Sequence, residues 1–157
     1  MIILAEKDAK IYGAITIDGP SDFAPPFAGI LFPCLIWDHD GRFTDAQRAA
    51  VAKELLDAGC RYAVCAGQNC EVWHDAVDSE LVRQDVDDPE KVREAMHVMT
   101  TWHAGESPDD VAFFFVLNTD FDEHEFTRYL VLHVGTSQAA EQVDAAVRRY
   151  ALDKEAV

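Results

Sequence analysis

Basic residues are scarce in this sequence. Its 157 residues include 13 lysines and arginines but 29 aspartates and glutamates, which gives a formal net charge of -16. Such a charge repels nucleic-acid backbones and anionic membrane surfaces. We therefore expect neither a nucleic-acid nor a membrane partner. A basic protein is the macromolecular partner that this charge favours, although acidity can also serve solubility alone.

The sequence also lacks the motifs that identify common cofactors. It contains no G-x-G-x-x-G dinucleotide fingerprint and no G-x-x-x-x-G-K-[ST] phosphate loop. Its few cysteines match neither the disulfide framework of a small secreted domain nor the two-residue spacing of zinc knuckles. We therefore predict reduced thiols, no metal and no cofactor. The cysteines are Cys34, Cys60, Cys65 and Cys70.

Long hydrophobic runs are absent too. The apolar stretch at residues 1–5 is too short for a signal peptide, and charged residues follow it at once. No apolar run reaches the length of a membrane span. Together with reduced cysteines, this predicts a cytoplasmic protein.

What the sequence does contain is a repeated alternation of apolar strand-like and amphipathic helix-like segments. With 49% hydrophobic residues the chain can bury a core, and its length fits one domain over residues 1–157. Strand-then-helix repeats predict a three-layer α/β domain with a mainly parallel sheet, Rossmann-like or flavodoxin-like. The strands are expected at residues 29–37, 61–67, 97–103 and 127–134, with the last two buried.

Helix boundaries are marked by local signals. Thr44 and Gln47 have the spacing of a capping box, and Gly59 is a typical C-terminal stop. Ser107 and the proline after it indicate a helix over residues 108–117, although aromatic residues there favour a strand; the need for a crossover between parallel strands decides for the helix. Further helices are expected at 70–83, from Asp88 as a short segment, and from about 137 to 153.

Residues 1–28 predict an N-terminal strand or hairpin and a Pro-rich connector. Alternating apolar residues from 11 to 17 indicate a strand that pairs with residues 2–4 or lies at a sheet edge. Pro33 lies inside the next apolar run and cannot donate a ladder hydrogen bond. That strand is therefore at an edge, carries a bulge, or begins after Pro33.

Polar residues follow the expected carboxyl ends of the parallel strands, where open α/β sheets bind ligands. Turn and cap positions favour the same residue types for local hydrogen bonds, so a purely structural role is the alternative. The catalytic candidates are His39, Cys70, His103 and Glu106. The ligand-binding candidates are Asp38, Asp40, Gln68, Asn69, Thr136 and Ser137.

Three of these positions suggest a specific chemistry. His39 and its flanking aspartates have the donor types of a divalent-metal site, but they lack the further ligands of a calcium loop, so an ordinary turn is favoured. Cys70 at a helix N-terminus is a possible nucleophile with His39 or His103 as base, against the alternative of an inert packing cysteine. The turn Gly135-Thr136-Ser137 comes before a helix, where free backbone amides can bind an anion.

Acidic residues cluster outside these strand ends. They form a predicted partner surface for a basic protein, with a solvated surface as the alternative. Its members are Asp85, Asp87, Asp88, Asp109, Asp110, Asp122 and Glu123.

The C-terminal half resembles a family of small uncharacterised bacterial α/β proteins. The likeness lies in the run Met99-Thr100-Thr101-Trp102-His103, in residues 121–126 and in residues 129–132. It implies a bacterial cytoplasmic protein and carries no activity, cofactor or catalytic residue with it.

Two functional hypotheses follow. The first is a non-enzymatic acidic interaction protein, immunity or antitoxin-like, that binds a basic protein partner. The alternative is a small-molecule hydrolase or ligand sensor that uses the crevice at the strand ends. A homo-oligomeric scaffold is a third possibility.

Overall fold

The computed structural model describes residues 1–90, 97–121 and 124–153. Its six-stranded sheet has the order β1-β2-β6-β3-β4-β5. β1 pairs antiparallel with β2, and the other neighbouring strands are parallel. The strands are β1 Ile2–Lys7, β2 Lys10–Ile17, β3 Phe32–Asp38, β4 Cys60–Gly67, β5 Met99–His103 and β6 Arg128–Val134.

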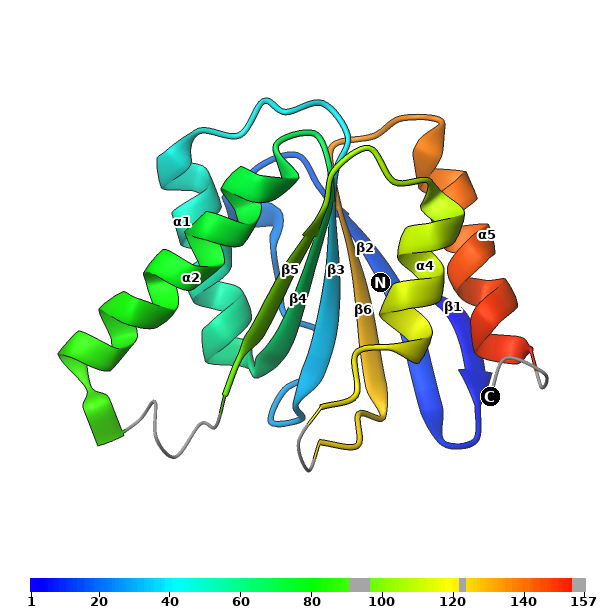
Figure 1. Cartoon of the computed structure of the whole chain (residues 1–157), viewed down its shortest axis with the longest axis horizontal. Helices are drawn as coiled ribbons and strands as arrows, with labels where there is room; N and C mark the ends of the chain where they lie inside the picture. The colour runs from blue at the N-terminus through cyan, green and yellow to red at the C-terminus, as the bar shows by residue number, and fades with distance from the viewer. Residues whose placement is uncertain (91–96, 122–123, 154–157) are drawn as a thin grey trace.

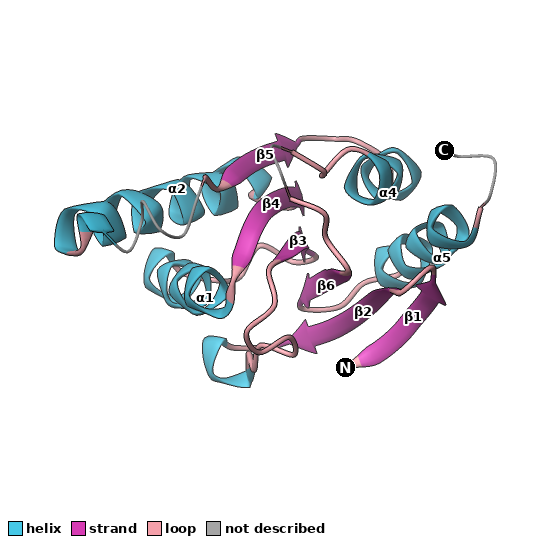
Figure 2. Ribbon diagram, turned by 90° about the horizontal axis from the view of Figure 1, so that it is seen from below, coloured by secondary structure: helices cyan, strands magenta, loops and turns pink. Residues whose placement is uncertain are grey.

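Helices cover both faces of this sheet. Figure 2 shows α1 and α2 on one face and α4 and α5 on the other. The chain is therefore a single three-layer α/β domain, as the alternating pattern predicts. The helices are α1 Asp45–Ala58, α2 Cys70–Asp87, α4 Pro108–Leu117 and α5 Ala139–Leu152, and a short 3-10 turn, η1, spans Pro20–Asp22.

Alternation along the strands divides the core in two. In β6, Leu130 and Leu132 face the cluster under α1 and α2, whereas Tyr129 and Val131 face the cluster under α4 and α5. Successive side chains of a strand point to opposite faces, so a strand buried on both faces is apolar throughout. β3 follows the same rule, and all its residues are buried.

The local helix signals are confirmed. Thr44 Oγ1 accepts from the amide of Gln47, whose side chain accepts from the amide of Thr44, and Gly59 takes the left-handed conformation after α1. Ser107 caps α4 by accepting from the amide of Asp110, and the aromatic segment is helical, as the crossover requires. α2 extends four residues beyond the predicted Arg83.

The N-terminal hairpin is also confirmed, with β1 and β2 paired antiparallel. Pro33 lies near the start of β3, in the middle of the sheet, and the register with β4 shifts between Phe32 and Pro33. Of the three expected possibilities, an irregularity beside Pro33 is the one that the register supports, but the additional residue is Arg61 on β4 and not a residue of β3. Pro33, which has no amide hydrogen to donate, lies before the paired part of the β3–β6 ladder, which starts at Cys34.

The expectation that residues 97–103 form a buried strand is wrong. β5 is an edge strand, and Met99 and Trp102 are 41% and 48% exposed. The crossover through α4 carries the chain from β5 past β4 and β3 to β6 (Figure 1). The short helix expected from Asp88 runs into residues 91–96, which lie outside the described residues.

None of the helices in the described part of the chain combines the length and apolar character needed to cross a membrane.

Candidate functional site

The five parallel strands all end at the edge that lies uppermost in Figure 1. β3 and β6 are neighbours there, and Asp38 pairs in register with Val134. The loops after these two strands therefore start side by side. This places His39 next to the loop that holds Thr136 and Ser137, 98 residues further along the chain.

Four side chains at this edge form a continuous hydrogen-bonded chain. His39 Nδ1 lies 2.6 Å from Ser137 Oγ, and His39 Nε2 lies 2.8 Å from His133 Nδ1. His133 Nε2 lies 2.9 Å from Asp144 Oδ1. We call Ser137, His39, His133 and Asp144 the histidine relay.

Sheet register brings the relay together. Trp37 pairs with His133, and both side chains lie on the face covered by α4 and α5. His39 is two residues beyond Trp37, and so it continues on that face. α5 returns over the same face and directs Asp144 towards His133 from between the buried Val143 and Val147.

The carboxylate fixes the direction of the hydrogen bonds. A carboxylate only accepts, so His133 Nε2 donates to Asp144. With both rings neutral, His133 Nδ1 then accepts from His39 Nε2, and His39 Nδ1 is left to accept from the Ser137 hydroxyl. The relay therefore presents an unprotonated nitrogen to an exposed serine.

Burial and, to a lesser extent, the neighbouring His133 lower the pKa of His39 from 6.5 to about 4, although Asp38, Asp40 and Asp144 act in the opposite direction. The ring is consequently neutral at pH 7. Its Nδ1 lone pair is available to take a proton from Ser137.

Asp38 holds the loop after β3 in place. Its buried carboxylate accepts from the Gly41 amide at 2.8 Å and from the Trp73 indole at 2.8 Å. Asp40 pairs with Arg42 at 2.8 Å, and the hydrogen bond from Arg42 lowers the pKa of Asp40. The described residues contain no group of three histidine, cysteine, aspartate or glutamate side chains placed to hold a metal.

The loop between β6 and α5 passes very close to Asp40. Gly135 has a φ of 72°, and a Cβ added there would lie 2.4 Å from Asp40 Oδ2. Only glycine fits both constraints. Ser137 Oγ also accepts from the Ala139 amide at 3.1 Å at the start of α5.

Two open hollows flank this loop. One has a volume of about 380 Å³ and is lined by residues that include Asp18, Arg42 and Gly135. The other has a volume of about 650 Å³ and is lined by Ser137, its neighbours and Glu141. Both are large enough for a small molecule.

The residues after β4 have structural contacts. Asn69 takes a left-handed conformation and donates from Nδ2 to Gly41 O at 3.3 Å. The backbone amide of Gln68 donates to the backbone carbonyl of Asp38. Cys70 is 5% exposed and packs in the core beneath α2. Among the described residues no hydrogen bond joins Cys70 to His39 or His103.

His103 and Glu106 form a separate pair. His103 Nδ1 lies 2.5 Å from Glu106 Oε2, and its Nε2 lies 3.1 Å from Thr101 Oγ1. β4 lies between β5 and β3, so this pair is roughly 10 Å from the relay. The structure thus brings His39 and Ser137 together and leaves His103 and Glu106 apart from them.

The acidic residues of the predicted partner surface also lie in separate places. Asp85, Asp87 and Asp88 lie at the end of α2, at the amino edge of the sheet, whereas Asp109 and Asp110 begin α4 at the opposite edge (Figure 1). Asp109 binds Arg149 and Tyr150, and Asp110 accepts from Ser107. Asp122 and Glu123 lie outside the described residues.

Sequence reasoning missed two of the four relay residues. His133 reads as a hydrogen-bonded core histidine, and the structure does bury it to 2% exposure. Asp144 gives no signal of its own, because an aspartate on an amphipathic helix is ordinarily solvated. The alternation of β3 and β6 would have placed His39 and His133 on one face, had the strand order been known.

The fold and this site define a small α/β protein with a polar site at the carboxyl edge of its sheet. The chain belongs to the family described as a domain of unknown function (DUF7684), whose model matches residues 16–150. No curated protein matches the chain.

Proposed function

We propose that this protein is a small-molecule hydrolase in which Ser137 is the nucleophile and His39 the general base. The histidine relay carries this proposal: an exposed serine hydroxyl lies 2.6 Å from a neutral imidazole, and that imidazole is oriented in turn through His133 by Asp144. A nucleophile, a base within hydrogen-bond reach and a third group that orients the base are the parts that acyl transfer requires.

The reaction follows from the direction of the hydrogen bonds. Ser137 Oγ attacks the acyl carbon of an ester as its proton passes to His39 Nδ1. The imidazolium formed there is stabilised through His133 by the carboxylate of Asp144. His39 then protonates the alcohol as it leaves. Water attacks the acyl-serine while His39 takes its proton; the bond between the acyl carbon and Ser137 Oγ then breaks, the carboxylic acid leaves, and His39 returns the proton to Ser137 Oγ.

The start of α5 supports an oxyanion site beside this nucleophile. In the described part of the chain, the backbone amides of Thr136, Ser137 and Gln138 have no hydrogen-bond acceptor. They lie at a helix N-terminus, where amides and the helix dipole stabilise negative charge. A substrate oxygen that becomes negative during attack by Ser137 would be close to them.

The acidic residues around the site favour some substrates over others. Asp18 lines one hollow and Glu141 the other, and the chain as a whole is strongly acidic. Such a field repels anionic substrates such as phosphate monoesters. Neutral or cationic carboxylic esters are the substrates that the site favours.

The test combines hydrolysis of p-nitrophenyl acetate and butyrate with labelling by a fluorophosphonate probe. We expect hydrolysis of the esters and a covalent adduct at Ser137, both reduced by more than about 100-fold in Ser137→Ala and His39→Ala. Ser79→Ala, an exposed serine on α2, is the matched control and should behave as the wild type. Labelling spread over several serines, or an adduct unchanged in His39→Ala, would contradict the proposal.

A further inference from the structure

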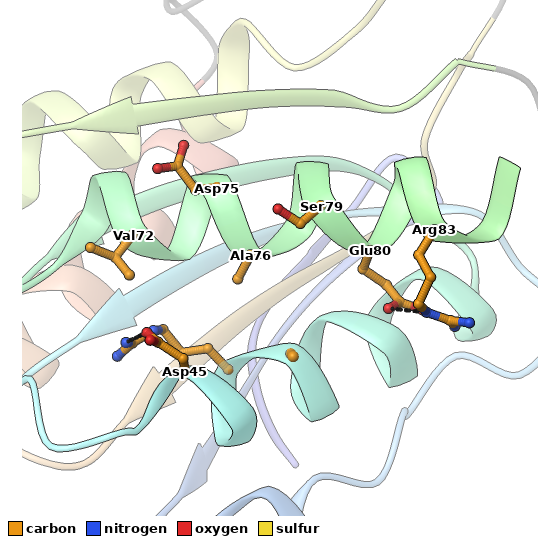
Figure 3. Close-up of a pocket in the computed structure, with 9 residues that line it drawn as sticks. Asp45, Val72, Asp75, Ala76, Ser79, Glu80 and Arg83 are labelled. Atoms are coloured by element: carbon orange, nitrogen blue, oxygen red, sulfur yellow. Dashed lines mark hydrogen bonds and ion pairs between the residues drawn. The ribbon is translucent and has the colours of Figure 1, made fainter. Parts of the chain in front are cut away.

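A groove separates α1 and α2 on the face of the molecule away from the relay. Its volume is about 370 Å³, and its floor includes Ala49, Val72 and Ala76. Figure 3 shows Val72, Ala76 and Glu80 pointing from α2 towards α1, with Arg83 over Glu80. The groove therefore has an apolar part, and the charged residues that line it include the ion pairs of Arg48 with Asp45 and Arg83 with Glu80.

The outer side of α2 carries three exposed valines, of which Val72 also lines the groove. Val72, Val82 and Val86 are 39%, 63% and 75% exposed. Val72, Ser79 and Val86 follow one another at intervals of seven residues, and Val82 lies seven residues after Asp75. This is the spacing that faces a second helix in a coiled coil. An α-helix is consequently the occupant whose shape suits this side of α2.

The charge of α2 indicates which kind of partner helix would bind. α2 carries six acidic residues and one arginine. That arginine, Arg83, already pairs with Glu80 at 2.6 Å and Asp87 at 2.5 Å, so it does not offset the remaining carboxylates. A second copy of this chain would bring two such surfaces together and be repelled. A helix with basic residues beside its apolar seam is complementary.

We infer that the groove between α1 and α2, with the strip Val72, Ser79, Val82 and Val86, docks an amphipathic helix of a partner protein. The partner helix places apolar residues at heptad spacing on the valines and its lysines or arginines against the acidic residues of α2. This surface is independent of the relay. It gives the acidity of the chain a defined location for a basic partner.

The test uses a 21-residue synthetic peptide with leucine at heptad positions a and d and lysine at e and g. Its fluorescence anisotropy is measured against the full-length protein at nanomolar peptide. We expect binding that weakens at least several-fold between about 50 and 300 mM salt, because opposite charges attract less when screened. A peptide with glutamate at e and g should not bind.

Two charge-neutral double variants separate the apolar strip from general acidity. Val72→Gln with Val86→Gln should weaken binding about tenfold, because both side chains leave the contact. Phe113→Gln with Leu152→Gln removes two similarly exposed apolar residues from α4 and α5 and should leave binding unchanged. Equal binding by the two variants would overturn the proposal.

Sedimentation velocity of the protein alone decides between a partner and a second copy. We expect a monomer in the wild type and in both double variants. A dimer that dissociates in Val72→Gln with Val86→Gln would overturn the proposal, since it would make a second copy the occupant.

Discussion

At the scale of single residues, Asp144 determines what Ser137 can do, although the two do not touch. Replacing Asp144 by asparagine keeps the shape but supplies an amide that can donate to His133 Nε2. His133 Nδ1 would then carry the proton and donate to His39 Nε2. His39 Nδ1 would be protonated in turn, with no lone pair for the serine hydroxyl.

Asp144→Asn should therefore lower kcat by at least about 100-fold while leaving KM for the ester nearly unchanged. Nitrogen NMR of the two imidazoles should show the proton moved from Nε2 to Nδ1 on both rings, a readout that does not depend on finding the substrate. Asp85→Asn, an exposed aspartate on α2, is the control. Unchanged tautomers in Asp144→Asn would contradict the assigned direction of the relay.

The relay also shows how far a sequence allows single residues to be predicted. His39 and Ser137 are predictable as candidates because His39 directly follows β3 and Ser137 lies in the short loop after β6, and strand ends are visible in the hydrophobic pattern. His133 and Asp144 are not, because their roles depend on β6 lying beside β3 and on α5 crossing that face. Neither relation is encoded near these residues in the chain.

At the scale of elements, the junction between β6 and α5 depends on Gly135. Alanine there would have to adopt a φ of 72° and place its Cβ 2.4 Å from Asp40 Oδ2. We expect Gly135→Ala to lower the free energy of unfolding by about 2 to 3 kcal/mol. Urea denaturation measures this loss.

Gly105 is the matched control for this junction. Its φ is 70°, but a Cβ added there meets nothing within 4 Å. Gly105→Ala should cost only the conformational part, about 1 kcal/mol. Equal losses in the two variants would show that the close approach of Asp40 to Gly135 contributes nothing to stability.

Helix ends that depend on nearby residues of the chain can be predicted from the sequence. Features that depend on neighbouring strands of the sheet cannot. The capping box at Thr44 and the stop at Gly59 directly flank the helix that they delimit, so the sequence predicts the limits of α1 correctly. The position of Pro33 left three possibilities, because a bulge is defined only by the register with β4. The sequence predicts a buried β5, since its apolar residues do not reveal that among the described strands it pairs with β4 alone.

At the scale of the whole molecule, the many acidic residues lie in separate regions of the surface. Counting acidic residues predicts the net charge of -16 and the preference for a basic partner. It does not predict that the end of α2 and the start of α4 lie at opposite edges of the sheet, because that follows from the antiparallel course of helices and strands. The interaction surface inferred on α2 therefore includes only one part of the acidic set.

The pH dependence of unfolding links the relay to the stability of the whole domain. The folded-state pKa of His39 is about 4, below its ordinary 6.5, so between these values the unfolded chain binds more protons. The free energy of unfolding should thus fall as pH drops from 6.5 to 4. Because the ring is only half-buried, we expect a loss of about 1 to 2 kcal/mol. His39→Gln should flatten this window while keeping the further loss below pH 4, where Asp40 and Glu80, whose pKa values are lowered, become protonated. Urea midpoints at pH 7, 5.5, 4 and about 3 measure both losses, and identical profiles for the two proteins would contradict a buried, neutral His39.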